Sequence, residues 1–136
     1  MAVTKGWQYT PGKDTRPVIL ATDVTESNVL TITVDTTTPV TVGICGAAGV
    51  PYGVTPKTVD ISEDGAQQTA VRDGIVVCIA AAAVTDLTIP LTTAASGQVT
   101  PCTVNNQIVL GKPLNLAALG EQVSVDLSTM GTYYGA

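Results

Sequence analysis

Apolar and polar residues alternate with a period of two along much of this chain. Residues 29–34 read Val-Leu-Thr-Ile-Thr-Val, which places threonines on one face and larger apolar side chains on the other. Successive side chains of a β-strand point to opposite sides, so this pattern is typical of a half-buried strand. The alternation resumes at residues 40–44 after a Thr- and Pro-containing turn, which predicts a hairpin over 29–45.

Similar short segments recur between clusters of turn-forming residues. We expect extended chain at 18–20, 58–61, 67–72, 74–80, 87–91, 98–100, 108–110 and 122–127. The Asp-Gly pair at 73–74 separates two of these segments, and this dipeptide favours a tight hairpin turn. Residues 62–65 predict a further turn.

Only residues 114–119 (Leu-Asn-Leu-Ala-Ala-Leu) favour a short helix, which Gly120 would end as a C-cap. Elsewhere the β-branched residues Val and Thr dominate, and they favour strands over long helices. Many short strands separated by turn signals predict an all-β fold. We expect a compact β-barrel or sandwich of short antiparallel strands with an irregular N-terminal arm.

Proline and glycine positions suggest how the chain is organised. We expect an extended N-terminal arm over residues 1–17, a single β domain over 18–131 and a flexible tail over 132–136. The length of 136 residues fits one domain that can bury a core of its own. The apolar residues are mostly small, with no Phe and one Trp, so we expect partner subunits to add stability.

Charge and hydropathy exclude two classes of partner. The net charge is -5, and the six basic residues form no stripe that could neutralise phosphates, which argues against nucleic acid. The longest apolar run, 75–84, is shorter than the roughly 20 residues that a membrane span needs. The first residues lack the apolar region of a signal peptide, so we expect synthesis in the cytoplasm.

The residues that usually carry catalysis are sparse. Histidine is absent, which excludes His-based acid–base and triad chemistry. Cys45, Cys78 and Cys102 have no zinc-type or redox-pair spacing, and we expect them to be buried free thiols, which suits a reducing compartment. No calcium-loop or phosphate-loop pattern occurs. We therefore expect no enzyme activity, no metal and no cofactor.

Aromatic residues are scarce, and most of them lie near the two chain ends; three of the six basic residues lie within the first 16 positions. Trp and Tyr are frequent anchors of protein interfaces. The basic residues are either solvated surface charge or a mildly basic arm that meets an acidic partner. Two interpretations of the aromatic pair in the arm stay open, namely anchoring onto the β domain and docking onto a partner. The candidate interface residues are Trp7, Tyr9, Lys13, Arg16, Tyr133 and Tyr134.

Two stretches of the chain resemble each other weakly. The first runs from Tyr52-Gly53 through Gly65 to Gly74, and the second from Leu110-Gly111 through Gly120 to Gly131. In each, a Gly precedes a spacer, and a second Gly opens a strand. The repeated spacing predicts a strand, a connection and a returning strand beside the first.

This arrangement resembles the small head proteins of tailed bacteriophages known as capsid decoration, cement or head fibre proteins. The resemblance covers about residues 50–131. The chain departs from the family's usual Gly-Asp before a central strand, where it has Ala94-Ala95-Ser96-Gly97-Gln98. The matching residues are Tyr52-Gly53-Val54, Gly65, Val71, Gly74-Ile75-Val76, Val109–Leu114, Ala118–Val123 and Val125-Asp126-Leu127.

The resemblance implies a homotrimer on the outer capsid surface of the virion, made in the host cytoplasm. There it would bind the major capsid protein and stabilise the shell by bridging neighbouring subunits. One alternative is another virion surface module, such as a tail, fibre or receptor-binding β domain. A bacterial adhesin-type domain is a further alternative, but it would need an export signal and would rarely keep three unpaired cysteines.

Overall fold

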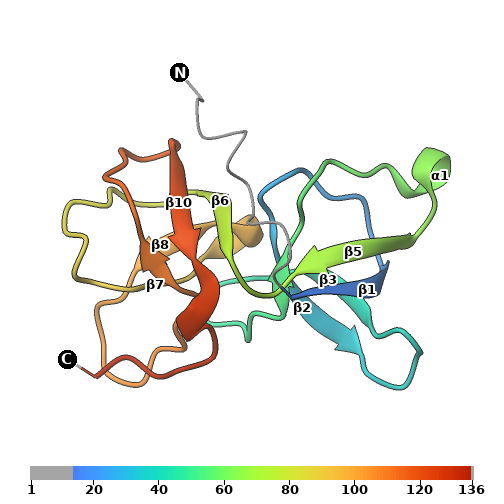
Figure 1. Cartoon of the computed structure of the whole chain (residues 1–136), viewed down its shortest axis with the longest axis horizontal. Coiled ribbons are helices and arrows are strands. Elements are labelled where there is room, and N and C mark those ends of the chain that lie inside the picture. Colours follow the sequence, from blue (N-terminus) through green and yellow to red (C-terminus); the bar gives the residue numbers. More distant parts are fainter. Residues whose placement is uncertain (1–13, 136) are drawn as a thin grey trace.

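The computed structural model describes residues 14–135, in which strands dominate (Figure 1). The predicted all-β fold is confirmed, and it contains a closed barrel. The first half, residues 14–72, contains β1 (Thr15–Leu20), β2 (Val29–Val34), β3 (Thr41–Ile44), β4 (Gly53–Val54) and β5 (Gln67–Val71). The second half, residues 74–135, contains β6 (Ile75–Ile79), β7 (Leu91–Thr93), β8 (Val99–Pro101), β9 (Lys112–Pro113) and β10 (Gln122–Asp126).

The first half forms the closed barrel, in the strand order β1-β3-β2-β4-β5. β1 runs parallel to β3 and antiparallel to β5, while β2 runs antiparallel to β3 and β4. The predicted hairpin over 29–45 is present as β2 and β3, with Leu30 opposite Ile44. Pairing of β4 with β5 completes the ring, so the backbone of each strand has a partner on both sides.

The second half repeats these pairings in the same order along the chain. The antiparallel pairs β6–β10, β7–β8 and β9–β10 correspond to β1–β5, β2–β3 and β4–β5. Isolated bridges take the remaining two places: Ala80 pairs in parallel with Val99, and Leu91 pairs with Gly111. The two halves therefore have the same topology.

The weak sequence repeat coincides with this structural repeat. Gly53 begins β4 and Gly111 precedes β9, and each of these short strands pairs with the strand that returns beside it. Gly65 and Gly120 open the returning strands with φ of 86° and 83°, in the region that favours glycine. The predicted strand, connection and returning strand are thus present in both halves.

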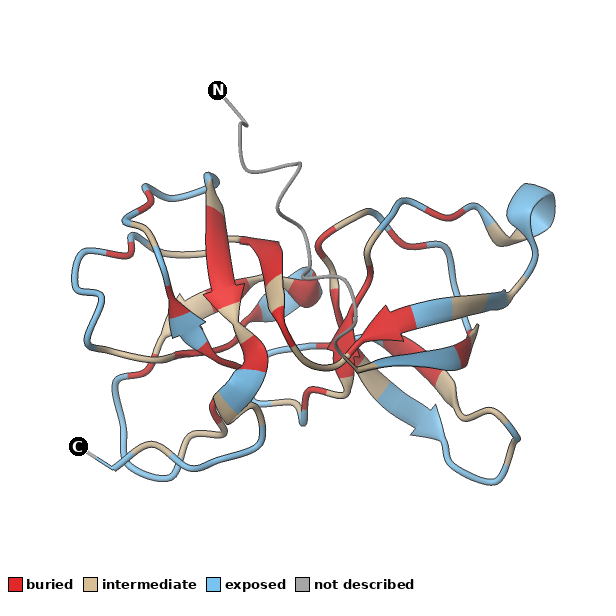
Figure 2. Ribbon diagram, in the orientation of Figure 1, coloured by how far each residue is buried: buried red, intermediate tan, exposed pale blue. Residues whose placement is uncertain are grey.

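Buried side chains form two clusters, which appear as concentrations of red in Figure 2. The first cluster belongs to the barrel and draws only on the first half: Val18, Leu20, Val24, Leu30, Val42, Val59 and Ala70. The second cluster fills the second half, and four residues from the first half join it: Val29, Cys45, Val54 and Val71. Alternation along β2, β4 and β5 turns Val29, Val54 and Val71 away from the barrel's interior, and with Cys45 they join the halves through an apolar contact.

The helical segment lies elsewhere than the sequence suggested. The helix α1 (Ile61–Asp64) occupies the β4–β5 connection, where a turn was expected. The predicted helix over 114–119 is wrong, because Ala117 pairs with Val84 and holds this segment against the second half. Two short 3-10 helices, Ala95–Gly97 and Leu127–Thr129, follow β7 and β10.

The predicted hairpin at Asp73–Gly74 is also wrong. β5 pairs with β1 and β4, whereas β6 pairs with β10, so the two strands are not partners. The Asp-Gly pair instead carries the chain from one half to the other. Gly74 has a φ of 104°, and this bend directs the chain out of the first barrel.

The first strand begins earlier than the predicted boundary between arm and domain. β1 starts at Thr15, which lies opposite Val71 of β5. The last three residues of the predicted arm, 15–17, therefore belong to the barrel.

The described part of the predicted C-terminal tail is held by backbone hydrogen bonds. The Thr132 carbonyl accepts from the Val109 amide at 2.8 Å, and the Tyr134 amide donates to the Gln107 carbonyl at 2.9 Å. Residues 132–134 thus extend along the β8–β9 connection.

Candidate interaction surfaces

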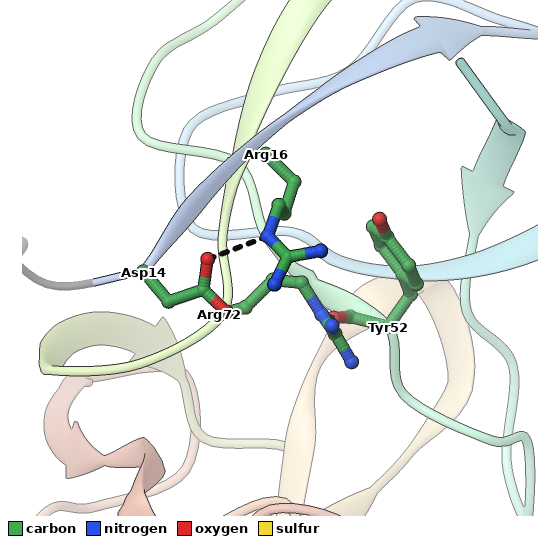
Figure 3. A network of polar contacts seen from close by, with 4 residues as sticks. All are labelled: Asp14, Arg16, Tyr52 and Arg72. Atoms are coloured by element: carbon green, nitrogen blue, oxygen red, sulfur yellow. Dashed lines mark hydrogen bonds and ion pairs between the residues drawn. The ribbon is translucent and has the colours of Figure 1, made fainter. Parts of the chain in front are cut away.

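Two arginines and a tyrosine gather where β1 begins and β5 ends (Figure 3). Arg16 lies on β1, Tyr52 directly precedes β4, and Arg72 directly follows β5. The Arg72 guanidinium carbon lies 4.5 Å from the centre of the Tyr52 ring, and its Nε donates to the Tyr52 carbonyl at 2.9 Å. We call these three residues the Arg–Tyr cluster.

Asp14 orients one of the two arginines. The Arg16 Nε donates to the Asp14 Oδ1 at 2.7 Å, and this bond, with the attraction between the charges, raises the pKa of Arg16. The side chain of Arg16 is 53% exposed, which leaves part of its guanidinium open to solvent. Guanidinium groups bind carboxylates and phosphates through paired N–H donors. The cluster can therefore bind an anionic group of a partner.

The second half has apolar residues at the positions that correspond to the cluster. The correspondence follows from matching backbone hydrogen bonds and strand register. The corresponding residues are Val76, Leu110 and Leu127, and each is at most 2% exposed. These equivalent positions are therefore buried in apolar packing in the second half. In the first half they carry positive charge, part of which is open to solvent.

A second candidate surface is an open cavity of about 340 Å³ at the C-terminal end of the described chain. Tyr133, Tyr134, Lys112 and Pro90 are among its lining residues. Tyr133 is 69% exposed, a high value for so large a ring. Tyrosine combines an apolar ring with a hydroxyl group, which suits a protein interface.

Further apolar side chains are exposed on the connections of the second half. Leu114, Leu116 and Leu119 lie between β9 and β10, and Leu119 is 71% exposed. The corresponding connection of the first half carries α1 and is mostly polar, with Asp60, Ser62 and Glu63 among its residues. The two halves therefore present different chemistry on equivalent connections.

The described residues include no group of His, Cys, Asp and Glu that could hold a metal ion. The three cysteines are free and buried, as the sequence predicted. Burial raises the pKa of Cys78 to about 12, so its thiol stays protonated at neutral pH and is a poor nucleophile. Within residues 14–135, no helix has the length and apolar character to cross a membrane.

The structure separates the predicted interface residues. Arg16 lies in the Arg–Tyr cluster of the first half, whereas Tyr133 and Tyr134 line the cavity of the second. Trp7, Tyr9 and Lys13 lie outside the described residues.

Sequence reasoning did not identify Tyr52 and Arg72 as candidate interface residues. Twenty positions separate them in the chain, and only closure of the barrel brings them together. The available signal was charge scarcity: Arg72 is one of only six basic residues and directly follows an alternating strand.

No protein-family model matches this chain, and no curated protein matches it either. Among solved structures, one match is the head fiber gp8.5 N base in bacteriophage phi29. The TM-score is 0.67 at 17% sequence identity, over 88% of this chain and 97% of the phage chain. The likeness thus includes both halves, and this chain shares its fold with that head fiber base.

Proposed function

We propose that this protein is a non-enzymatic structural protein of a tailed-bacteriophage virion. It acts as a homotrimer on the outer surface of the head, where it binds the major capsid protein and bridges neighbouring subunits. It is made in the host cytoplasm and uses no cofactor, nucleic acid or membrane. The observation that carries the proposal is the fold shared with the phi29 head fiber base over 88% of the chain.

The Arg–Tyr cluster supports a contact with another protein. The described residues carry four basic side chains, and two of them meet at this one place (Figure 3). Arginine and tyrosine are enriched among the residues that dominate binding energy at interfaces. We propose that the cluster binds an acidic group of the major capsid protein.

A second candidate is another virion surface module, such as a tail, fibre or receptor-binding β domain. The observation that favours it is the open cavity of about 340 Å³, because small-ligand sites start at about this size. A receptor-binding module would retain a host-surface ligand in this cavity and would not bind isolated heads.

Binding to shells tests the first proposal directly. Purified protein is mixed with phage shells that lack surface proteins, and the pellet is analysed after sedimentation. We expect co-sedimentation at a fixed ratio to the major capsid protein. Protein that stays in the supernatant at all concentrations would contradict the proposal.

Substitution of Arg16 tests the contribution of the cluster. We expect Arg16→Ala to weaken shell binding by about tenfold, because it removes a charged hydrogen-bonding group. The matched control is Lys57→Ala, which removes an exposed positive charge from the β4–β5 connection. Equal losses in the two variants would mean that net charge, rather than the cluster, governs binding.

Deletion of residues 1–13 tests the predicted role of the arm. This deletion leaves β1 intact, since the strand begins at Thr15. We expect the shortened protein to keep its unfolding transition and to bind shells more weakly. Unchanged affinity for shells would exclude a role for Trp7, Tyr9 and Lys13 in binding.

A further inference from the structure

The strand β6 has a strand partner on one side only. The sheet order β6-β10-β9 places β6 at an edge, with β10 beside it (Figure 1). On the other side of β6, the part of the chain that the structure describes supplies a single bridge, between Ala80 and Val99. This bridge lies just beyond the end of the strand, so the edge along residues 75–79 is open to a further strand.

Backbone hydrogen bonds at the two ends of β6 show which groups point to the open side. The Ala80 amide donates to the Glu121 carbonyl at 2.9 Å. The Gly74 carbonyl accepts from the Leu127 amide, also at 2.9 Å. Because bonding alternates along an antiparallel strand, the even-numbered residues bond toward β10. The N–H and C=O groups of the odd-numbered residues of β6 therefore point to the open side.

Val77 lies at the middle of this edge and is only 1% exposed. Water therefore has little access to its outward-directed N–H and C=O groups, and buried backbone groups that lack a partner cost free energy. Its side chain lies on the face opposite to those of Val76 and Cys78, which join the second core. Val77 itself belongs to neither core cluster. A further strand along the open side would supply partners for its backbone groups.

The first half protects the corresponding edge in another way. Matching strand register equates Val77 with Pro17 of β1, and proline has no N–H to offer to a further strand. β1 is also paired further along this side, since the Ile19 amide donates to the Val40 carbonyl at 2.9 Å. Within residues 14–135, β6 has only the bridge at Ala80 on this side, and a valine replaces the proline. The edge of β6 is thus the less protected of the two.

The chain enters the described structure next to the start of β6. The carbonyl of Asp14, the first described residue, accepts from the Arg72 amide at 2.8 Å and from the Asp73 amide at 3.3 Å. Asp73 lies two positions before Ile75, where β6 begins. Residues 1–13, which we call the N-terminal segment, therefore join the barrel close to the open edge. An extended segment of this length spans up to about 45 Å, and the edge measures about 17 Å.

The N-terminal segment has a sequence that suits a strand at this edge. Trp7 and Tyr9 alternate with polar residues, so an extended chain presents both rings on one face. The segment contains two lysines and no acidic residue. Residues 14–135 carry all eleven acidic residues of the chain and only four basic ones. Attraction between opposite charges therefore favours contact of the segment with the rest of the chain.

We propose that residues 5–10 pair antiparallel with β6 of the same chain and add a fourth strand to the sheet β6-β10-β9. The direction follows from the entry point, because the segment leads to Asp14 beside the start of β6. The added strand bonds the outward-directed groups of Val77 and places Trp7 and Tyr9 on one face of the enlarged sheet. An edge strand keeps one side open, so this pairing is compatible with a contact to a shell but does not depend on it.

Amide hydrogen exchange measured by NMR tests the pairing residue by residue. The full chain is compared with a variant that lacks residues 1–13, which leaves β1 complete. We expect the Val77 amide to exchange at least about tenfold faster in the variant, because its partner is lost. The Cys78 amide, which bonds toward β10, should change much less, and protection of the Ala70 amide in β5 shows that the barrel remains folded. Equal rates at Val77 would overturn the proposal.

Proline substitutions test the pairing in the full-length chain. Proline is tolerated in an edge strand only where its N–H would face solvent, and adjacent residues point in opposite directions. At least one of Gln8→Pro and Tyr9→Pro should therefore accelerate exchange at Val77 by about tenfold. The matched control is Ala2→Pro, which lies outside the proposed strand and should leave the rate unchanged. Wild-type exchange in both variants, or an equal acceleration in the control, would contradict the pairing.

A mixed sample distinguishes pairing within a chain from pairing between copies. The variant that lacks residues 1–13 is labelled with ¹⁵N and refolded together with an excess of unlabelled full chain. Each full chain already uses its own N-terminal segment, so we expect the labelled Val77 amide to keep its fast exchange. Slower exchange in the mixture would show that the segment of one copy pairs with β6 of another, and it would overturn pairing within the chain.

Discussion

Gly111 shows how a single residue sets the approach of two strands. A Cβ atom at this position would collide with the Asp126 carbonyl oxygen and would lie 2.7 Å from Val125 Cγ1. Gly53, its counterpart in the first half, lies in the same way against Val71, whose carbonyl oxygen would be 2.8 Å from a Cβ atom. The glycines of the sequence repeat are thus explained by backbone contact, which a side chain would prevent.

We expect Gly111→Ala to lower the free energy of unfolding by about 2 kcal/mol, because the backbone must shift to admit the methyl group. Urea unfolding at equilibrium measures the difference. The control is Gly46→Ala, since a Cβ atom there has no neighbour within 4 Å, and its effect should stay within about 0.5 kcal/mol. Similar effects of both substitutions would refute the proposed collision.

At the scale of elements, the sequence predicted strands better than it predicted their partners. The segments around β2, β3 and β10 were recognised because one buried face imposes a local alternation. The partners of β5 and β6 depend on strands far along the chain, so the local Asp-Gly signal at 73–74 was misleading. Which strands pair with each other depends on the tertiary structure, and a short stretch of sequence does not contain that information.

The same limit applies to the helix and to the candidate site. Residues 114–119 have helical propensity, but Ala117 is held by Val84, which the sequence places 33 positions away. Arg16 was identified from its charge alone. Its neighbours Tyr52 and Arg72 lie 36 and 56 positions further along the chain, so their contact could not be predicted locally.

The start of α1 depends on a charged cap. Asp60 accepts hydrogen bonds from the Ser62 hydroxyl at 2.7 Å and from its amide at 3.0 Å, and these bonds lower the pKa of Asp60 below 3.8. A carboxyl group whose pKa falls on folding adds stability above its unfolded pKa. That stability is lost as the pH falls through the lowered folded value.

We therefore expect Asp60→Ala to destabilise the protein at pH 7, with a difference from the wild type that shrinks as the pH falls below about 4. Urea unfolding across a series of pH values measures this difference. Asp35→Ala removes an exposed carboxylate from the β2–β3 connection and serves as the control. A difference between the Asp60 variant and the wild type that does not depend on pH would show that the cap acts through something other than its charge.

At the scale of the molecule, the two halves share a topology, but only the first has a core built from its own residues alone. The core of the first barrel contains only first-half residues, and its ring of strands is closed. The core of the second half includes Val29, Cys45, Val54 and Val71 from the first. Removal of the first half would expose the part of the second core that these four side chains cover.

We expect a fragment of residues 1–73 to fold alone, and a fragment of residues 74–136 to stay unfolded or to aggregate. Circular dichroism and the cooperativity of thermal unfolding measure both outcomes. Addition of the first fragment should restore a cooperative transition to the second. Independent folding of the second fragment would show that its own apolar residues suffice.

Because the second core includes first-half residues but the first core includes none from the second half, the two halves are expected to fold in a set order during synthesis. The first half leaves the ribosome first and can bury its interior at once, before the strands of the second half exist. The second half then emerges beside a finished surface that carries Val29, Val54 and Val71. Translation from the N-terminus therefore makes the folded first half available before the second half, whose core requires it. Two halves with one topology can then fold in a single chain with little opportunity to exchange strands.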